Sequence, residues 1–293
     1  MSNDLALDKR LLRRSFEQAA AGYDAAAVLQ HEVCRRMLSR LDYIKHAPAA
    51  VLDAGSGTGN VATALRARYP QATLYALDIA LAMVRRARAR MPWWQRLLGR
   101  GVLPVCGDIE QLPLRDAAVG MVWSNLALQW SNEPQRACAE FRRVLAPGGL
   151  LMFSTFGPDT LKELRAAYQG IDRYTHINRF IDMHDIGDML VHGGFADPVM
   201  DMEYITLTYT DVLALMRDLK AIGAHNVTAG RRPGMTARAT LAAVERNYEA
   251  WRRDGRLPAT FEVVYGHAWV PQPRTTADGR PIIPIKASTR PPL

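Results

Sequence analysis

Between residues 49 and 156, short apolar runs alternate with longer segments of helical periodicity. Strands are predicted for residues 49–55, 72–78, 102–108, 118–126 and 150–156. Helices are predicted for residues 58–69, 80–91 and 133–145. Strands joined by helices of this length form a parallel sheet with right-handed crossovers. The alternation therefore predicts an α/β fold, doubly wound, with helices on both faces of the sheet.

The pattern changes after Phe156. Helices are predicted for residues 157–169 and 183–194, and a helical stretch from Asp211 to about Arg253; strands are predicted for residues 198–209 and 259–270. We expect one domain over residues 1–270. The tail, residues 271–293, has six prolines in 23 residues and is expected to be mobile.

Composition narrows the class of protein. The three cysteines, Cys34, Cys106 and Cys138, are far apart, which argues against disulfides and zinc and favours a reducing, cytoplasmic setting. No apolar run reaches membrane-spanning length, so no membrane partner is expected. The net charge is +8, and residues 61–100 hold eight arginines against one acid. This segment is either a solvated helix face or a docking patch for an acidic partner; no nucleic-acid-binding motif accompanies it.

A glycine-rich loop follows the first predicted strand. Gly55, Gly57 and Gly59 are spaced G-x-G-x-G, and Asn60 stands where a dinucleotide loop has its third glycine. Asp53 lies two residues before the first glycine, and its carboxylate would repel a pyrophosphate but suits a cation. The loop therefore predicts a nucleotide-like ligand that is positively charged and has no phosphates.

S-adenosylmethionine fits that description, and "LDAGSGTG" resembles the first motif of the class I methyltransferases. In that family an acid after the second strand holds the ribose and another after the third strand meets the adenine. The resemblance implies these cofactor-binding residues: Asp53, Gly55, Gly57, Gly59, Asp78, Ile79, Met83, Asp108, Ile109 and Asn125. It also implies a Rossmann-like, seven-stranded sheet whose last strand is antiparallel. Asp78 as a helix N-cap and Asp108 as a turn residue remain simpler alternatives.

The segment before the first strand, "RRSFEQAAAGYDAAAVLQHEV", is amphipathic. In many relatives such a segment closes over the cofactor, so a helical lid is expected over about residues 5–45. Tyr23 and Gln30 are then candidates to face the sulfonium or the methionine end, Tyr23 through cation–π attraction. Tyr23 could instead be an ordinary packing aromatic.

Four further segments sharpen the resemblance: "RRSFEQAAAGYDAAAVLQ", "SNLALQW", "RVLAPGGLLMFSTFGPDTLKELR" and "LMRDLKAIGAHN". Together they resemble the malonyl-[acyl-carrier protein] O-methyltransferases of biotin synthesis, over nearly the whole chain up to Val270. The resemblance implies methylation of the free carboxylate of a malonyl-phosphopantetheine group carried by an acidic acyl-carrier protein. An inserted cap, about residues 158–195 and 211–254, would admit the phosphopantetheine arm.

The implied reaction needs no general acid or base, because a malonyl carboxylate is already ionised at neutral pH. It needs alignment and a dry site, so Tyr23 and Trp130 are candidate walls. A cation should position the carboxylate; the candidates are Arg143, Arg165, Arg217 and Lys220, each of which could equally be a surface charge. No metal is expected, because His184 and its neighbouring aspartates match no ligand spacing.

Two alternatives stay open. A similar mitochondrial family acts in respiratory complex I assembly and is associated with arginine hydroxylation; it shares much of "STFGPDTLKELR". The chain could also be a non-catalytic module that binds S-adenosylmethionine. One departure from the family pattern is Gly120, which stands where an aspartate is frequent at the start of the fourth strand.

Overall fold

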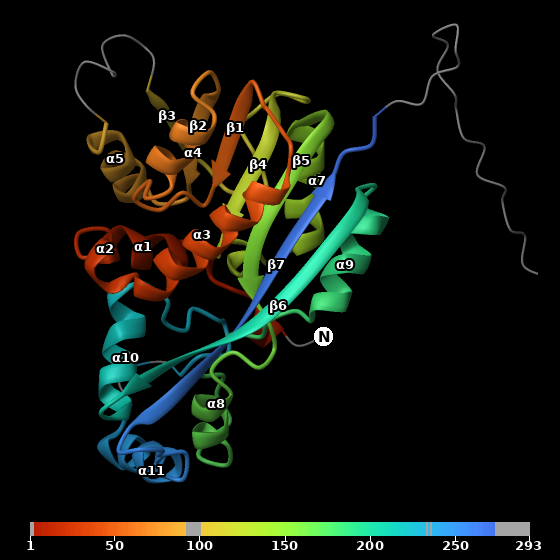
Figure 1. Ribbon diagram of the computed structural model, residues 1–293. Coiled ribbons are helices and arrows are strands. Elements are labelled where there is room, and N and C mark those ends of the chain that lie inside the picture. Colours follow the sequence, from red (N-terminus) through yellow and green to blue (C-terminus); the bar gives the residue numbers. More distant parts are fainter. Residues whose placement is uncertain (1–2, 92–100, 233, 235, 273–293) are drawn as a thin grey trace, which may run out of the picture.

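One mixed sheet organises the computed structural model, which describes residues 3–91, 101–232, 234 and 236–272 (Figure 1). Its seven strands are β1 (Ala50–Ala54), β2 (Thr73–Asp78), β3 (Val102–Cys106), β4 (Val119–Asn125), β5 (Leu145–Phe156), β6 (Ala196–Tyr209) and β7 (Leu257–Trp269). Their order is β3-β2-β1-β4-β5-β7-β6, and β7 runs antiparallel to both of its neighbours. The predicted Rossmann-like sheet with an antiparallel last strand is confirmed. The predicted mobile tail lies, from residue 273 on, outside the described residues.

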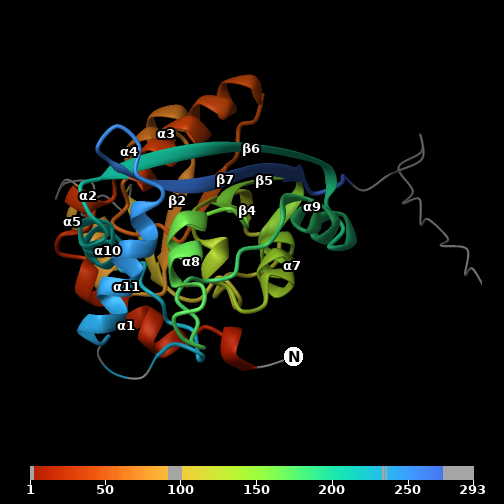
Figure 2. The same ribbon diagram turned by 90° about the horizontal axis from the view of Figure 1, so that it is seen from below.

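Helices cover both faces of this sheet (Figure 2). They are α1 (Lys9–Ala19), α2 (Tyr23–Ala26), α3 (Val28–Arg40), α4 (Ala62–Arg68), α5 (Leu81–Ala89), α7 (Pro134–Val144), α8 (Lys162–Tyr168), α9 (Met183–His192), α10 (Val212–Ala221) and α11 (Arg238–Glu249). Short 3-10 turns are η1 (Asn3–Leu5), η2 (Leu41–Tyr43) and η3 (Leu128–Trp130). Alternate residues of β1 point to opposite faces: Val51 packs into the core under α3 and α4, and Leu52 into the core under α7 and α9.

Strand β5 begins earlier than predicted, at Leu145 instead of Leu150. Leu145 pairs with Val119 of β4, and the register shifts before Leu150 pairs with Met121. The "APGG" segment between them is an irregular part of the strand. Within it Gly148 has a φ of +74° and donates its N–H to the carbonyl of Val270 at 2.9 Å, so the segment stays bonded to the chain that follows β7.

The N-terminal segment lies across the carboxyl ends of the strands, where the sequence predicts a lid (Figure 1). It is tied to three separate parts of the molecule. The Asp8 N–H donates to the carbonyl of Val227 at 2.9 Å. The Asn132 side chain exchanges two hydrogen bonds with the backbone of Leu7, at 2.7 and 2.9 Å. The Glu17 carboxylate accepts the N–H groups that begin α5. These ties hold α1 against the end of the sheet.

The region predicted as a cap contributes helices of two kinds. Helices α8, α10 and α11 lie beyond the carboxyl end of the sheet (Figure 1), and α8 packs against α11. Helix α9 instead packs on β6 and α7. The predicted helical stretch from Asp211 is two helices, because Gly223 takes a φ of +73° after α10 and the chain then runs irregularly to α11. That irregular segment faces the N-terminal helices.

Among the residues that the structure describes, no helix is long and apolar enough to cross a membrane. Within the same ranges, no three histidine, cysteine, aspartate or glutamate side chains gather as metal ligands.

Candidate functional site

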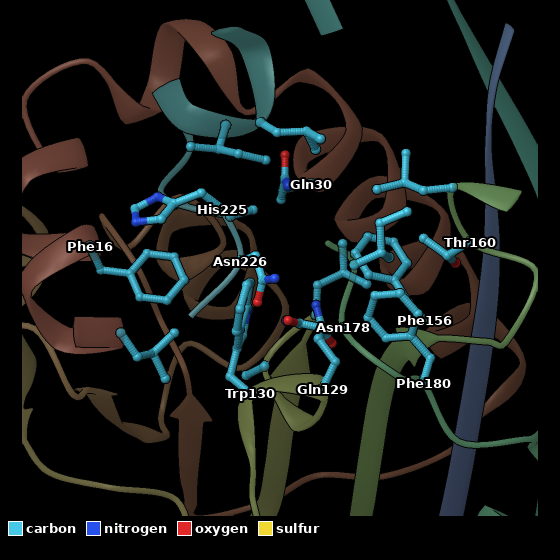
Figure 3. Close-up of a pocket in the computed structure, with 18 of the residues that line it drawn as sticks. Phe16, Gln30, Gln129, Trp130, Phe156, Thr160, Asn178, Phe180, His225 and Asn226 are labelled. Carbon is cyan, nitrogen blue, oxygen red and sulfur yellow. The ribbon is translucent and has the colours of Figure 1, made fainter. Parts of the chain in front are cut away.

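A cavity of about 390 Å³ opens at the carboxyl ends of the strands, between the N-terminal helices and the cap (Figure 3). Its walls come from α1, α2 and α3, from the loops that follow β1 to β4, from α8 and α10, and from residues 175–180 and 224–232. In open α/β sheets ligands bind at this edge. The volume suits a small organic ligand.

The three glycines of the loop after β1 all need a conformation that favours glycine. Gly55, Gly57 and Gly59 have φ angles of +82°, +52° and +76°. A Cβ on Gly55 would lie 2.3 Å from the Cβ of Ala127, and one on Gly59 would lie 2.8 Å from the Cβ of Ala87. Gly55 and Gly57 line the cavity, whereas Gly59 lets α5 pack closely.

Asp53 is buried behind the loop, 2% exposed, and its Oδ2 has no partner among the described residues. Burial, and then the nearby charge of Asp78, raises the pKa of Asp53 to about 8. Other unpartnered polar atoms gather around it: the Oε1 of Gln30, the Nε2 of His31 and the Oγ of Ser56. Buried polar groups rarely stay unpaired, so this end of the site fits a ligand that brings a cation and hydrogen-bonding atoms.

Asp78 ends β2 and borders the cavity. Its Oδ2 accepts the N–H of Gly57 at 2.9 Å and its Oδ1 accepts that of Ala80 at 2.9 Å. Burial raises its pKa to about 6, against the effect of these backbone donors. Asp78 thus holds the backbone just before α5 and borders the cavity. The apolar side chains of Ile79 and Met83 line the cavity beside it.

Asp108 and Ile109 line the same wall after β3. Asp108 is ion-paired to Lys9 of α1 at 3.1 Å, and Lys9 also contacts Glu110 at 3.1 Å. The sequence reasoning missed Lys9, because no motif marks a lid residue that pairs with a residue about a hundred positions away. This pair fastens α1 over the cavity.

The remaining predicted cofactor residues come together under the lid. Tyr23 lies over Gly57, with 3.8 Å between its Cε1 and a Cβ built there, and burial and nearby acids raise the pKa of its hydroxyl. The Asn125 side chain donates to the backbone carbonyl of Gln30 at 3.2 Å. Tyr23, Gln30 and Asn125 therefore border both the main cavity and the small recess around Asp53.

Of the positioning candidates, only Trp130 and Tyr23 are among the described residues that line the cavity. Trp130 packs edge-on against Phe16 of α1, with 5.4 Å between ring centroids. The four predicted cations lie elsewhere. Arg143 binds Glu140 and Asp116 and holds the loop before β4.

The other three cations belong to helices of the cap. Arg165 donates to the carbonyls of Pro158 and Thr160. The side chain of Arg217 is 76% exposed, and Lys220 lies in the last turn of α10. None of these three is among the described residues that border the cavity.

Sequence reasoning missed several lining side chains. Figure 3 shows Gln129, Asn178, Asn226, His225 and Thr160 around the cavity. Gln129 stands one residue before Trp130 and could have been found from "SNLALQW", but the others come from the cap, where no motif marks them. His225 contacts the Oγ of Ser15 at 2.9 Å; its pKa is lowered by burial and by Lys220 and Arg231 nearby.

The sequence is also similar to proteins of one known family. The sequence matches the family described as "Methyltransferase domain" over residues 52–153. It is 58% identical to a malonyl-[acyl-carrier protein] O-methyltransferase of Gallionella capsiferriformans, covering 96% of this chain and 97% of the relative. It is 60% identical to the protein of that name from Nitrosospira multiformis, covering 93% and 92%.

Solved structures share the architecture. The YcgJ protein of Bacillus subtilis superposes with a TM-score of 0.57 at 14% identity, covering 83% of this chain and 99% of that one. The [4+2]-cyclase SpnF superposes with a TM-score of 0.51 at 20% identity, covering 82% of each. At these identities the likeness concerns the fold alone, and one fold serves several chemistries.

Proposed function

The chain belongs to the malonyl-[acyl-carrier protein] O-methyltransferase family, and from that premise we propose that it transfers a methyl group from S-adenosylmethionine to the free carboxylate of malonyl-acyl-carrier protein. The observation that carries the proposal is the identity of 58–60% over nearly the full length of both chains. The resemblance of the sequence places such a step early in biotin synthesis. The hydroxylase and non-catalytic alternatives are not favoured, since these relatives are named for methyl transfer.

The residues around the cavity suit S-adenosylmethionine. The unpartnered carboxylate oxygen of Asp53 suits the amino group of the methionine part, because that charge would relieve a buried carboxylate. Asp78, which borders the cavity, suits the ribose hydroxyls, and Asp108 with Ile109 suits the adenine. Gly55 and Gly57 allow close approach of the backbone.

S-adenosylmethionine, when bound, supplies an electrophilic methyl group on a sulfonium sulfur, which a carboxylate oxygen displaces in line. The chain itself must align the two partners and keep water out. Phe16 of α1 and Trp130 of η3 pack together over one wall and exclude solvent there. No side chain has to take a proton, because the substrate carboxylate is already ionised.

An acidic carrier protein would find a basic surface beside the lid. Arg85, Arg86 and Arg88 are exposed on α5, and α5 packs against α1, whose Arg13 and Arg14 are also exposed. Such a surface speeds and orients the docking of an acidic partner. We propose neither a nucleic acid nor a membrane as a partner of this protein. The proposal includes a cytoplasmic location, supported by the three free cysteines.

A methyl-transfer assay tests the proposal. Purified protein and labelled S-adenosylmethionine are mixed with malonyl-carrier protein, malonyl-coenzyme A, acetyl-carrier protein or no acceptor, and products are read by mass spectrometry. We expect one added methyl on the malonyl acceptors and none on acetyl-carrier protein, which lacks the free carboxylate. Methylation of acetyl-carrier protein, or no transfer with the cofactor bound, would contradict the proposed function.

A further inference from the structure

Two arginines, Arg231 and Arg232, line the cavity from the irregular segment between α10 and α11. Both are partly buried, and neither forms an ion pair with a carboxylate among the described residues. Lys9, which also lines the cavity, is by contrast paired with Asp108 and Glu110. The two arginines therefore keep most of their hydrogen-bonding capacity for a ligand that carries negative charge.

Arg231 stands on backbone that is held from two sides. The N–H of Gly230 donates to the carbonyl of Asp4 in the N-terminal segment at 2.7 Å, and the carbonyl of Gly230 accepts the N–H of Thr175 at 3.1 Å. The guanidinium is itself oriented, because its Nη1 donates to the carbonyl of the buried Thr228 at 3.0 Å. Its Nε and Nη2 have no hydrogen-bond partner among the described residues, so the side chain is fixed by one contact and open through the others.

The surroundings of Arg231 are electropositive. His225 faces the same cavity (Figure 3), and its pKa is lowered by burial and then by the charges of Lys220 and Arg231. The acid of α10 that lines the cavity, Asp218, accepts the hydroxyl of Tyr209 at 2.7 Å and is not ion-paired to either arginine. Positive potential inside a partly closed cavity favours an anionic ligand.

Arg232 has more contacts of its own. Its Nη1 donates to the Oγ1 of Thr240 at 3.3 Å. The pKa of Asp172 is lowered, against the effect of its burial, by a hydrogen bond from His176 and by charges that include Arg232. An acid of the protein thus already interacts with Arg232, whereas Arg231 has no such neighbour among the described residues.

We infer that Arg231 binds the carboxylate of the malonyl acceptor, with Arg232 adding positive charge beside it. The inference rests on the proposed function and names the cation that the implied reaction requires. A guanidinium offers two parallel N–H donors to a carboxylate, which fixes the direction of its oxygens as well as its position. In the step a carboxylate oxygen forms a bond to the methyl carbon, the carbon–sulfur bond breaks with its electron pair going to sulfur, and no proton moves.

The charge of the acceptor disappears in this step, which gives the contact a kinetic signature. The carboxylate is fully charged in the bound substrate, partly charged in the transition state and neutral as the ester. Arg231 therefore stabilises the bound substrate more than the transition state, and it releases the product.

The test uses malonyl-pantetheine as acceptor, because it has the carboxylate and the arm but neither the phosphate nor the carrier surface. Arg231→Gln should raise KM about ten- to hundredfold and change kcat by less than about threefold. Arg231→Lys, which keeps the charge but not the planar pair of donors, should recover only part of the loss. Arg217→Gln, the same change at an exposed cation of α10 that does not border the cavity, is the matched control and should leave KM unchanged.

A second acceptor separates binding of the carboxylate from a structural role. Acetyl-pantetheine has the same arm without the carboxylate, so its inhibition constant against malonyl-pantetheine should stay within about twofold of wild type in Arg231→Gln. The affinity for S-adenosylhomocysteine, measured by calorimetry, should also be unchanged and shows that the variant is folded. If the enzyme methylates only malonyl-carrier protein, the same comparison is made with malonyl- and acetyl-carrier protein.

Three results would overturn the inference. One is an acceptor KM in Arg231→Gln within about twofold of wild type. Another is an equal loss of affinity for the malonyl and acetyl compounds, which would give Arg231 a structural role. The third is a larger rise in KM for Arg232→Gln than for Arg231→Gln, which would assign the carboxylate to Arg232. A wild-type enzyme that methylates neither malonyl acceptor would instead overturn the proposed function, and this inference with it.

Discussion

At the scale of single residues, burying the carboxyl group of Asp53 is unfavourable for the protein by itself but suits the binding of a cationic ligand. Its carboxyl group is buried, its Oδ2 has no partner among the described residues, and burial raises its pKa to about 8. A ligand ammonium group favours the ionised carboxylate and lowers that pKa. Below pH about 8, binding must therefore release a proton from Asp53.

The first prediction concerns this linkage. The affinity for S-adenosylhomocysteine, which keeps the amino group, should rise with pH and level off near pH 8. Asp53→Asn should weaken binding about ten- to hundredfold and remove the part of the pH dependence due to Asp53. Calorimetry in two buffers of different ionisation heat measures both affinity and proton release. Asp185→Asn, an exposed site on α9, is the control, and equal proton release in wild type and Asp53→Asn would contradict the assignment.

The same raised pKa bears on stability without cofactor. The folded pKa of Asp53 lies above its ordinary value of 3.8, so the protein favours the protonated form. The stability that the Asp53 carboxyl group contributes to the folded protein is therefore fully present below pH about 3.8 and is lost as pH rises toward about 8. Asp78, with its pKa raised to about 6, acts in the same direction.

At the scale of elements, helix α1 of the predicted lid is held in place by its side chains. Glu17 of α1 accepts the N–H of Leu81 at 2.7 Å and that of Ala82 at 3.0 Å, which are otherwise unpaired donors at the start of α5. Glu17 thus pairs the free N–H groups at the start of α5, and the same hydrogen bonds fasten α1 to α5. This coupling joins the lid to the helix that follows Asp78.

The second prediction is that Glu17→Ala loosens the lid. Loss of the two hydrogen bonds should lower the free energy of unfolding by about 1–2 kcal/mol and speed amide hydrogen exchange in α1 and in the first turn of α5. Dissociation of S-adenosylhomocysteine should also be faster. Gln18→Ala, at the exposed neighbouring position, is the control. Unchanged exchange in α1 would show that its packing alone holds the lid.

Elements also show how far sequence reasoning reaches. The sheet could be predicted, because hydrophobic periodicity and the glycine loop are local signals, and the cofactor-facing residues follow from strand ends. The bulge in β5 could not, because its partner is Val270, far along the chain. Asn178 was missed for the same reason, because it comes from the cap and no local motif marks it, whereas Gln129 lies within "SNLALQW" and was within reach.

At the scale of the whole molecule, a group of exposed arginines lies on the side of the sheet where the cavity opens. Exposed arginines of α5 adjoin the lid, whereas Lys45 is exposed just before β1, at the amino edge of the sheet.

The third prediction is that Arg86→Glu raises KM for malonyl-carrier protein several-fold and reduces its salt dependence. Malonyl-pantetheine, which has no protein surface, should be unaffected. Lys45→Glu makes an equal change of charge at the opposite edge; an equal effect of both variants would show that only net charge matters.

The position of β7 has a consequence for how the protein is made. Strand β7, the last of the seven described strands in the sequence, lies between β5 and β6; it pairs with β6 along nearly its whole length and with β5 from Val263 to Trp269. Until Leu257 and the residues after it leave the ribosome, the edge of β5 and the edge of the long β6 that later pair with β7 have no neighbour. Open strand edges invite pairing with other chains. The nascent protein is thus most prone to aggregate while β7, the strand that closes the sheet, has yet to emerge.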